Sequence, residues 1–235
     1  MNKDYIIEEL GRLGTEQTKK TYIRHGAKEP LFGVKIGDIK TLVKYVKKNQ
    51  ELALELYDTG IFEAMYLVSL SIDPKLLTKE ELERWMSKSN WPSVSEDIIA
   101  KVAAESNFAL ELASDWIKSE DELIAICGWN TYSNYLSITK DELLNLSHIK
   151  RLLNLIEETI HEERNRVRYT MNNFVISVGA FVKPLYNEAL SVAHNIGKVN
   201  VNLGETACKV PVATEYLKKI EERGSIGKKK KTCIC

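Results

Sequence analysis

Two adjacent carboxylates, Glu96 and Asp97, follow Trp91 at the expected start of a helix. A carboxylate held beside an aromatic ring in a partly desolvated cleft can stabilise positive charge that develops during a reaction. The same stretch also fits an ordinary helix start, because Ser93 and Glu96 have the spacing of a capping box and Pro92 suits the position before the first turn. A catalytic site and a capped helix are therefore both compatible with these residues.

Basic residues gather in two stretches that could bind phosphate groups. Arg164, Arg166 and Arg168 open an expected helix, and Arg164 and Arg168 lie one turn apart on the same face. Guanidinium groups in this arrangement suit phosphate oxygens, but the glutamates immediately upstream could equally pair with them. A second stripe lies on the expected helix at residues 39–48, where it could follow a phosphate backbone or form a solvated face. Its members are Lys40, Lys44, Lys47 and Lys48.

The composition of the 235 residues argues against several other classes of function. The 33 basic and 33 acidic residues leave no net charge, which disfavours uniform attraction to polyanions but allows one basic face. No apolar run approaches the roughly 20 residues of a membrane span. The four cysteines and four histidines lack the spacing of a disulfide framework or a zinc site, and no phosphate-binding glycine motif occurs. We therefore expect a cytoplasmic protein without a metal, a cofactor or a membrane partner.

These residues belong to a chain that is helical in pattern almost throughout. Apolar residues recur at helical spacing in short segments, which are separated by proline, glycine or asparagine breaks. Segments of this length, together with a weak echo between residues 52–56 and 108–112, predict an all-α solenoid of antiparallel helical repeats. The main expected helices cover residues 39–48, 52–57, 61–72, 79–88, 95–104, 108–117, 120–135, 140–146, 149–161, 164–181, 184–195 and 210–222.

Two segments depart from this pattern. Residues 196–204 alternate apolar and polar side chains between two glycines, which predicts a short strand or a small β-hairpin. The C-terminal segment carries four consecutive lysines, from Lys228 to Lys231, and we expect it to be flexible and solvated. The sequence therefore predicts one helical-repeat domain over residues 1–223 and a basic tail over residues 224–235.

Three stretches resemble the AlkD-like DNA alkylation-repair proteins, which are built from HEAT-like helical repeats. Residues 31–40 are similar to the family's aromatic-Gly-Val entry into a basic helix, residues 116–119 to the end of a mid-chain helix, and residues 90–98 to its Trp-Trp-Asp-x-Val-Asp element. The resemblance extends over most of residues 1–190. It implies a HEAT-like fold whose basic groove holds duplex DNA. Active members of the family remove N3- and N7-alkylated purines, using an aspartate supported by an arginine and flanked by tryptophans.

Carried over by position, most of that catalytic set is replaced. Trp91 matches the first tryptophan of the family element, whereas Pro92 stands at the second. Glu96 stands at the catalytic aspartate, and Asp97 follows it. The remaining substitutions are Ile126 for the supporting arginine and Asn173, beside Phe174, for a late tryptophan.

We therefore expect a monomer that binds double-stranded or branched DNA through its backbone, with an altered active site and weak or no base excision. A first alternative is an active N-glycosylase, in which Glu96 or Asp97 acts as the carboxylate and Trp129 or Tyr132 replaces the lost aromatic residues. A second alternative is a helical scaffold that binds a peptide. The residues expected to line the DNA groove are Trp91, Trp129, Tyr132, Asn173, Phe174, Lys40, Lys44, Arg164, Arg166 and Arg168.

Overall fold

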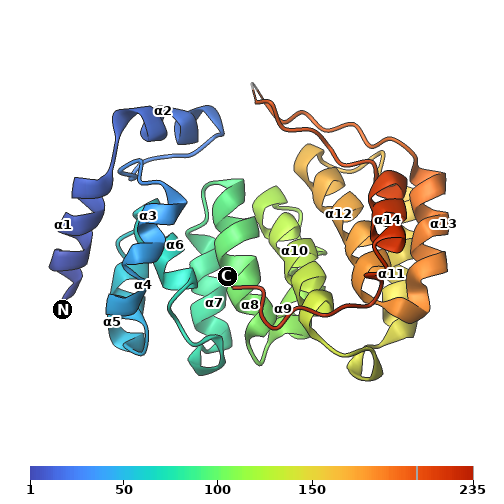
Figure 1. Ribbon diagram of the computed structural model, residues 1–235, viewed down its shortest axis with the longest axis horizontal. Helices are drawn as coiled ribbons and strands as arrows, with labels where there is room; N and C mark the ends of the chain where they lie inside the picture. Colours follow the sequence, from blue (N-terminus) through green and yellow to red (C-terminus); the bar gives the residue numbers. More distant parts are fainter. Residues whose placement is uncertain (205, 235) are drawn as a thin grey trace. The chain divides into compact units, whose positions relative to one another are not determined.

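The computed structural model describes residues 1–204 and 206–234, and all regular structure within them is helical (Figure 1). This confirms the predicted all-α fold. The chain divides into two compact units, which are described separately. Unit 1 comprises Met1–Asn107 and two short pieces from near the C-terminus, and unit 2 comprises Phe108–Leu203 and Ala207–Cys233.

Unit 1 is a stack of short helices packed around α6. Helix α6 contacts α1, α3, α4, α5 and the π-helix η2, because all but one of its side chains are buried and most are apolar. The elements of unit 1 are α1 (Lys3–Leu13), α2 (Glu16–Arg24), α3 (Ile36–Thr41), α4 (Val43–Val46), α5 (Gln50–Tyr57), α6 (Phe62–Ser69), η1 (Pro74–Leu76), α7 (Lys79–Ser87), η2 (Val94–Ile99) and α8 (Ala100–Glu105).

The helix start after Trp91 differs from the expected one. Ser93 already has helical backbone angles, φ −65° and ψ −28°, and its side chain caps no backbone amide. The amide of Val94 instead donates to the carbonyl of Trp91 at 3.0 Å, so the helical turn begins before the predicted capping box. The capping-box interpretation is therefore wrong, because the residue assigned as the cap lies inside the helix.

Unit 2 is built around two long helices, α10 and α12, which pack against each other. On their outer sides α9 packs against α10, while α13 and α14 pack against α12 (Figure 1). The elements are α9 (Ala109–Trp116), α10 (Glu122–Ile138), η3 (Asp141–Leu143), α11 (Leu146–Thr159), α12 (Asn165–Phe181), η4 (Lys183–Leu185), α13 (Tyr186–Ile196) and α14 (Ala213–Glu222).

A single glycine sets how closely α10 approaches the end of α9. A Cβ atom on Gly128 would lie 2.5 Å from the amide nitrogen of Ile117 and 2.8 Å from the carbonyl carbon of Trp116. Both atoms belong to the backbone and cannot rotate away. The two helices therefore pack at this distance only because residue 128 has no side chain.

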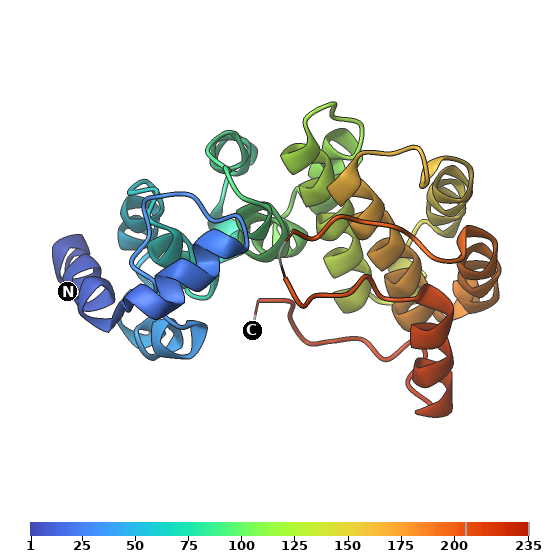
Figure 2. The same cartoon turned by 90° about the horizontal axis from the view of Figure 1, so that it is seen from above.

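Residues 197–203 run away from α13 and residues 207–212 return to α14 (Figures 1 and 2). No strand forms in the described part of this segment, so the hairpin prediction is not met there. Its outgoing limb is tied to α12 by an amide pair. The side chain of Asn165 accepts a hydrogen bond from the amide of Asn202 and donates one to its carbonyl, each at 2.8 Å. A side chain thus supplies the hydrogen bonds that a partner strand would have supplied.

The lysine-rich tail packs against unit 2 instead of extending into solvent. The amide of Gly227 donates to the carbonyl of Ala180 at 2.8 Å, and the amide of Lys230 donates to Ser137 at 2.8 Å. Lys229 donates to the carbonyl of Leu136 at 3.0 Å. Residues 227–230 therefore run across the ends of α10 and α12, which corrects the expectation of a fully solvated segment.

Candidate nucleic-acid interface

Trp91 is a core residue of unit 1. Its side chain is 5% exposed, and its indole N–H donates to the carbonyl of His25 at 2.9 Å. The ring meets Phe62 edge-on, with the centroids 4.7 Å apart, and lies beside Tyr22. The predicted position of Trp91 on a groove wall is therefore wrong, because the ring fastens the end of α2 to the core.

The two carboxylates after Trp91 lie on η2 and remain accessible. Glu96 and Asp97 are both half-buried, and Asp97 forms an ion pair with Lys101 one turn later at 3.3 Å. Tyr66 lies in the same neighbourhood. Burial raises the pKa of its hydroxyl, the Lys101 ammonium opposes this rise, and the Asp97 carboxylate adds to it. The carboxylates of Glu96 and Asp97 thus reach the surface near a neutral phenol.

A buried glutamate that was not singled out from the sequence holds the loop before α3. Glu63 is fully buried, and its carboxylate accepts hydrogen bonds from the amides of Phe32, Gly33 and Val34 at 3.0, 2.7 and 3.1 Å. Tyr22 closes the same loop by donating to the carbonyl of Val34 at 2.8 Å. Burial and the nearby carboxylate of Glu63 raise the pKa of Tyr22 to about 12, so its hydroxyl stays a donor. The signal in the sequence was one acidic residue inside an apolar helix.

This loop leads into the lysine stripe, which is the set Lys40, Lys44, Lys47 and Lys48. All four side chains are exposed, and none takes part in an ion pair within residues 1–204 and 206–234. The Lys44 ammonium lies 4.7 Å from the centroid of the Tyr45 ring. The stripe thus presents positive charge that no acidic side chain of the described residues neutralises, which is what contact with a phosphate backbone requires.

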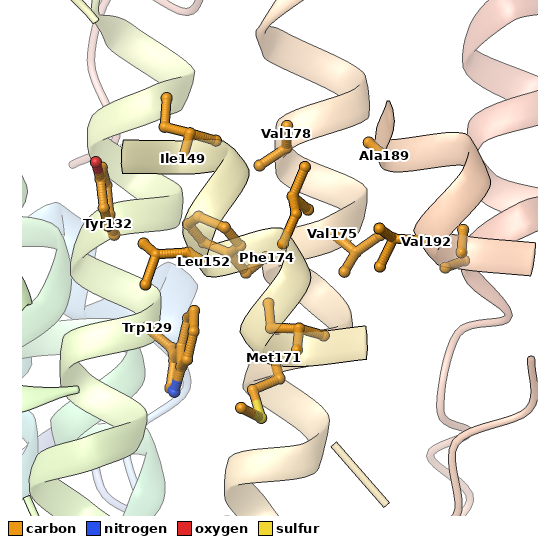
Figure 3. Packing of buried hydrophobic residues seen from close by; sticks show 14 of the residues in the cluster. Trp129, Tyr132, Ile149, Leu152, Met171, Phe174, Val175, Val178, Ala189 and Val192 are labelled. Carbon is orange, nitrogen blue, oxygen red and sulfur yellow. The ribbon is translucent and has the colours of Figure 1, made fainter. Parts of the chain in front are cut away.

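The predicted groove aromatics of unit 2 form its core (Figure 3). Trp129 is 1% exposed, Tyr132 is 2% exposed and Phe174 is fully buried. The ring centroid of Phe174 lies 5.2 Å from that of Trp129 and 5.5 Å from that of Tyr132. Their assignment to a DNA-contacting surface is wrong, because the packing of α10 against α12 excludes all three rings from solvent.

Arg164 has a structural role at the start of α12. Its guanidinium donates to the carbonyls of Ser119, at 2.9 Å, and Glu120. It also lies 3.3 Å from the carboxylate of Glu163. These contacts fasten α12 to the turn between α9 and α10. The upstream glutamates therefore supply one of its partners, as the alternative to phosphate binding anticipated.

The other two arginines of the cluster are half-buried. The guanidinium of Arg166 lies over the ring of Tyr169 at 4.4 Å from its centroid, and its backbone amide donates to Glu122 at 2.7 Å. The Nε atom of Arg168 is buried and meets no hydrogen-bond partner in the part of the chain that the structure describes. The structure therefore separates the three arginines into different environments.

A polar hollow of about 360 Å³, called here the α10–α12 hollow, lies beside these helices in unit 2. Asn173 from α12 is the one predicted site residue among its lining. Facing α10 and α12 across it are residues from near α14 and from the C-terminal tail. The lining combines aromatic rings, amides and cations, namely Tyr169, Phe181, Tyr216, Asn130, Asn134, Asn173, Lys209 and Lys230, and contains no carboxylate among the described residues. This site was not predicted from the sequence, because its residues come from segments far apart in the chain.

Comparison with known proteins identifies the family. The model of the family described as DNA alkylation repair enzyme matches residues 6–217. The chain belongs to the DNA alkylation repair enzyme family. Proteins Lin0241 of Listeria innocua and Lmo0209 of Listeria monocytogenes are each 35% identical over 226 residues, which cover 94% of this chain and 97% of theirs.

One solved structure is similar to this DNA alkylation repair family member over its whole length. The two structures superpose with a TM-score of 0.91, and the sequences are 37% identical over 100% of both chains. That protein is described as one of "a new family of proteins related to the HEAT-like repeat DNA glycosylases with affinity for branched DNA structures". The predicted family resemblance and the HEAT-like repeat fold are thus confirmed.

The described residues of this family member contain neither a candidate membrane-spanning helix nor a candidate metal site. No described helix has both the length and the apolar character needed to span a bilayer. Within the same residues, His, Cys, Asp and Glu side chains nowhere gather in the groups of three that could hold a metal ion.

Proposed function

We propose that this protein binds branched or otherwise structured duplex DNA through the sugar-phosphate backbone and excises bases weakly or not at all. The observation that carries the proposal is the full-length match, at 37% identity, to a protein with affinity for branched DNA structures. At this similarity the two chains place corresponding surface residues on corresponding helices. A shared class of DNA partner is therefore the simplest expectation.

The lysine stripe supports binding through the backbone. Lys40 and Lys44 lie on successive helical turns of α3 and α4, and their ammonium groups are exposed and form no ion pair with the described residues. Contacts from such flexible cations to phosphates give affinity without reading a base sequence. A protein that recognises the shape of DNA needs contacts of this kind.

Three positions support weak excision. Ile126 is fully buried and apolar where the family resemblance places an arginine, and it therefore cannot orient a carboxylate. Pro92 and Asn173 are half-buried and stand where it places tryptophans. Glu96 retains a negative charge, but its side chain is one methylene longer than that of the family's aspartate. The charge is thus retained, but the arginine and the two tryptophans that accompany it in the family are replaced at these positions.

An active N-glycosylase is the second candidate, and one observation favours it. Glu96 and Asp97 both reach the surface of η2, and π-helical turns occur frequently at functional sites. Trp129 and Tyr132 cannot take the place of the lost aromatic residues in this version, because both side chains are buried. The carboxylates would have to act without them.

A gel-shift titration tests the binding half of the proposal. Three-way and four-way junctions and a linear duplex of equal length should be compared at about 50 and 200 mM salt, where phosphate-dominated binding changes most. We expect at least about tenfold tighter binding of the junctions, or roughly 1.4 kcal/mol, and weaker binding of every substrate at the higher salt. Equal affinity for junction and linear duplex would refute the preference for branched DNA.

A base-release assay tests the catalytic half. Duplex containing N7-methylguanine or N3-methyladenine should release free base only slightly faster, or no faster, with the protein than without it. Rapid release that is abolished in the variant carrying Glu96→Gln and Asp97→Asn would establish the second candidate instead.

A further inference from the structure

The lining of the α10–α12 hollow contains partners for each part of a nucleotide, namely its base and its phosphate. Tyr169, Phe181 and Tyr216 contribute rings against which a planar base can stack. Lys209 and Lys230 contribute positive charge for a phosphate, and no acidic side chain of the described residues lines the hollow to repel it. Its volume of about 360 Å³ falls within the usual range for small-molecule sites. A site for inorganic phosphate alone would not need the rings.

Several hydrogen-bonding groups at the hollow are unused within the protein. Among the described residues, the side chains of Asn130, Asn173 and Ser177 meet no protein partner. Asn134 donates its amide N–H to the carbonyl of Asn130 at 2.9 Å, which leaves its side-chain oxygen as an acceptor. Amide groups present donors and acceptors together, as the edge of a nucleobase does. The hollow therefore contains unused hydrogen-bond donors and acceptors of the kind that can recognise the edge of a base.

The packed tail positions one of the two cations. The backbone of Lys230 is fixed by the bond from its amide to Ser137, and its ammonium lies 5.2 Å from the centroid of the Phe181 ring. The neighbouring Lys229 is tied to Asp141 at 2.8 Å. Neither Lys209 nor Lys230 takes part in an ion pair in the described part of the chain. Both charges thus remain available to an anionic ligand.

We infer that the α10–α12 hollow binds one unpaired nucleotide of a branched DNA. The inference rests on the proposed function and names the feature of the DNA that this site recognises. The base stacks on the lining rings, the amides meet its exposed edge, and Lys209 and Lys230 pair with its phosphate. A paired base cannot enter, since its edge is occupied and it is stacked in the duplex, whereas a nucleotide already unpaired at a branch point enters at the lowest energetic cost.

Charge-matched variants test the inference on DNA. The variant K209Q/K230Q removes the two lining lysines, and K228Q/K231Q removes two exposed lysines of the same tail that do not line the hollow. The substrates are a three-way junction with two unpaired nucleotides at the branch point and the same junction fully paired. We expect K209Q/K230Q to lose at least about tenfold in affinity for the first and only about two- to threefold for the second. K228Q/K231Q should lose equally little for both, and equal losses in the two variants would overturn the inference.

A charge-neutral variant separates base recognition from electrostatics. N130A/N173A keeps helix-favouring residues on α10 and α12 but removes the two unused amides. It should lose the preference for the junction with unpaired nucleotides while keeping its affinity for the paired one. An unchanged preference would contradict a role for these amides in holding a base.

Titration with a mononucleotide tests the hollow without any junction. Thymidine 5′-monophosphate should bind the wild-type protein, as measured by calorimetry, more tightly than thymidine or inorganic phosphate, and K209Q/K230Q should weaken this binding at least about tenfold. If junctions bind but the mononucleotide does not, and unpaired nucleotides confer no preference, the inference fails while the proposed function stands. If the mononucleotide binds but junctions are not preferred over linear duplex, the proposed function fails instead.

Discussion

Glu63 is a buried carboxylate whose partners are three backbone amides, and no cation forms an ion pair with it in the described residues. A buried charge of this kind is tolerated because hydrogen-bond donors replace the water it lost. The arrangement closes the loop at Gly33, whose φ of +79° suits only glycine and whose absent Cβ would lie 2.5 Å from the carbonyl oxygen of Thr15. The lysine stripe therefore follows a loop in which one carboxylate binds three successive backbone amides.

The substitution Glu63→Gln tests that dependence. Glutamine keeps one acceptor oxygen but directs an N–H₂ group at amide donors, so we expect the free energy of unfolding to fall by about 1–3 kcal/mol. Urea denaturation followed by circular dichroism measures the change. Glu55→Gln, on the exposed face of α5, is the matched control and should change the free energy by less than about 0.5 kcal/mol. Equal midpoints for the two variants would contradict the structural role of Glu63.

The C-terminal tail behaves as an element of unit 2, although it has no regular structure in its described residues. The ion pair between Lys229 and Asp141 is largely shielded, with side-chain exposures of 17% and 23%. Lys229→Met keeps the length of the side chain but leaves Asp141 without its ion-pair partner and the carbonyl of Leu136 without its donor. We expect a loss of about 1–3 kcal/mol in the free energy of unfolding, measured with urea. Lys231→Met, at an exposed position of the same tail, should have little effect, and a loss as large as that of Lys229→Met would argue against the docked tail.

Helix periodicity predicted the elements well where one face of a helix is apolar. Residues 164–181 and 184–195 of the sequence prediction nearly coincide with α12 and α13, because spacing along one helix is local information. The expected helix at residues 140–146 is instead the short turn η3 followed by α11.

The packing of the C-terminal tail could not be predicted from its composition. A run of lysines has the same composition whether it is solvated or packed against the protein, and Leu136, which accepts the hydrogen bond of Lys229, lies 93 residues away.

The candidate site was harder to predict than the fold. A groove wall and a core both require large aromatic residues, so residue type alone could not tell that Trp91, Trp129 and Tyr132 face inward. The amide partners of Glu63 lie 29 to 31 residues away, beyond the reach of any local pattern. Exposed charge was predicted more successfully, since Lys40 and Lys44 needed only to lie opposite the apolar residues of their own segment, which forms α3 and α4.

For the complete protein, two separate groups of residues should contribute to DNA binding. The lysine stripe should give affinity for any duplex, and the α10–α12 hollow should give the preference for branched DNA. Neutralising the lysine stripe in K40Q/K44Q/K47Q/K48Q should reduce the slope of log affinity against log salt by up to about 3.6, since each phosphate that a lysine neutralises adds about 0.9 to the slope. Affinity for junction and linear duplex should fall together, because in the proposed function the stripe meets phosphates that both substrates share. Fluorescence anisotropy at several salt concentrations measures the slope.

The control removes the same amount of charge elsewhere. K20Q/K28Q/K75Q/K140Q replaces four exposed lysines in other segments and should reduce the slope much less. A similar reduction in both variants would mean that net charge, and not the position of the stripe, governs binding.

Gly128 has a consequence for how this family can vary. The backbone atoms of Trp116 and Ile117 occupy the space that any side chain at position 128 would need. Surface lysines can be exchanged, and core residues can be replaced by others of similar volume, without separating α9 from α10. In evolutionary terms, position 128 has only two choices: it remains glycine, or the two helices move apart and unit 2 repacks its core around a different spacing.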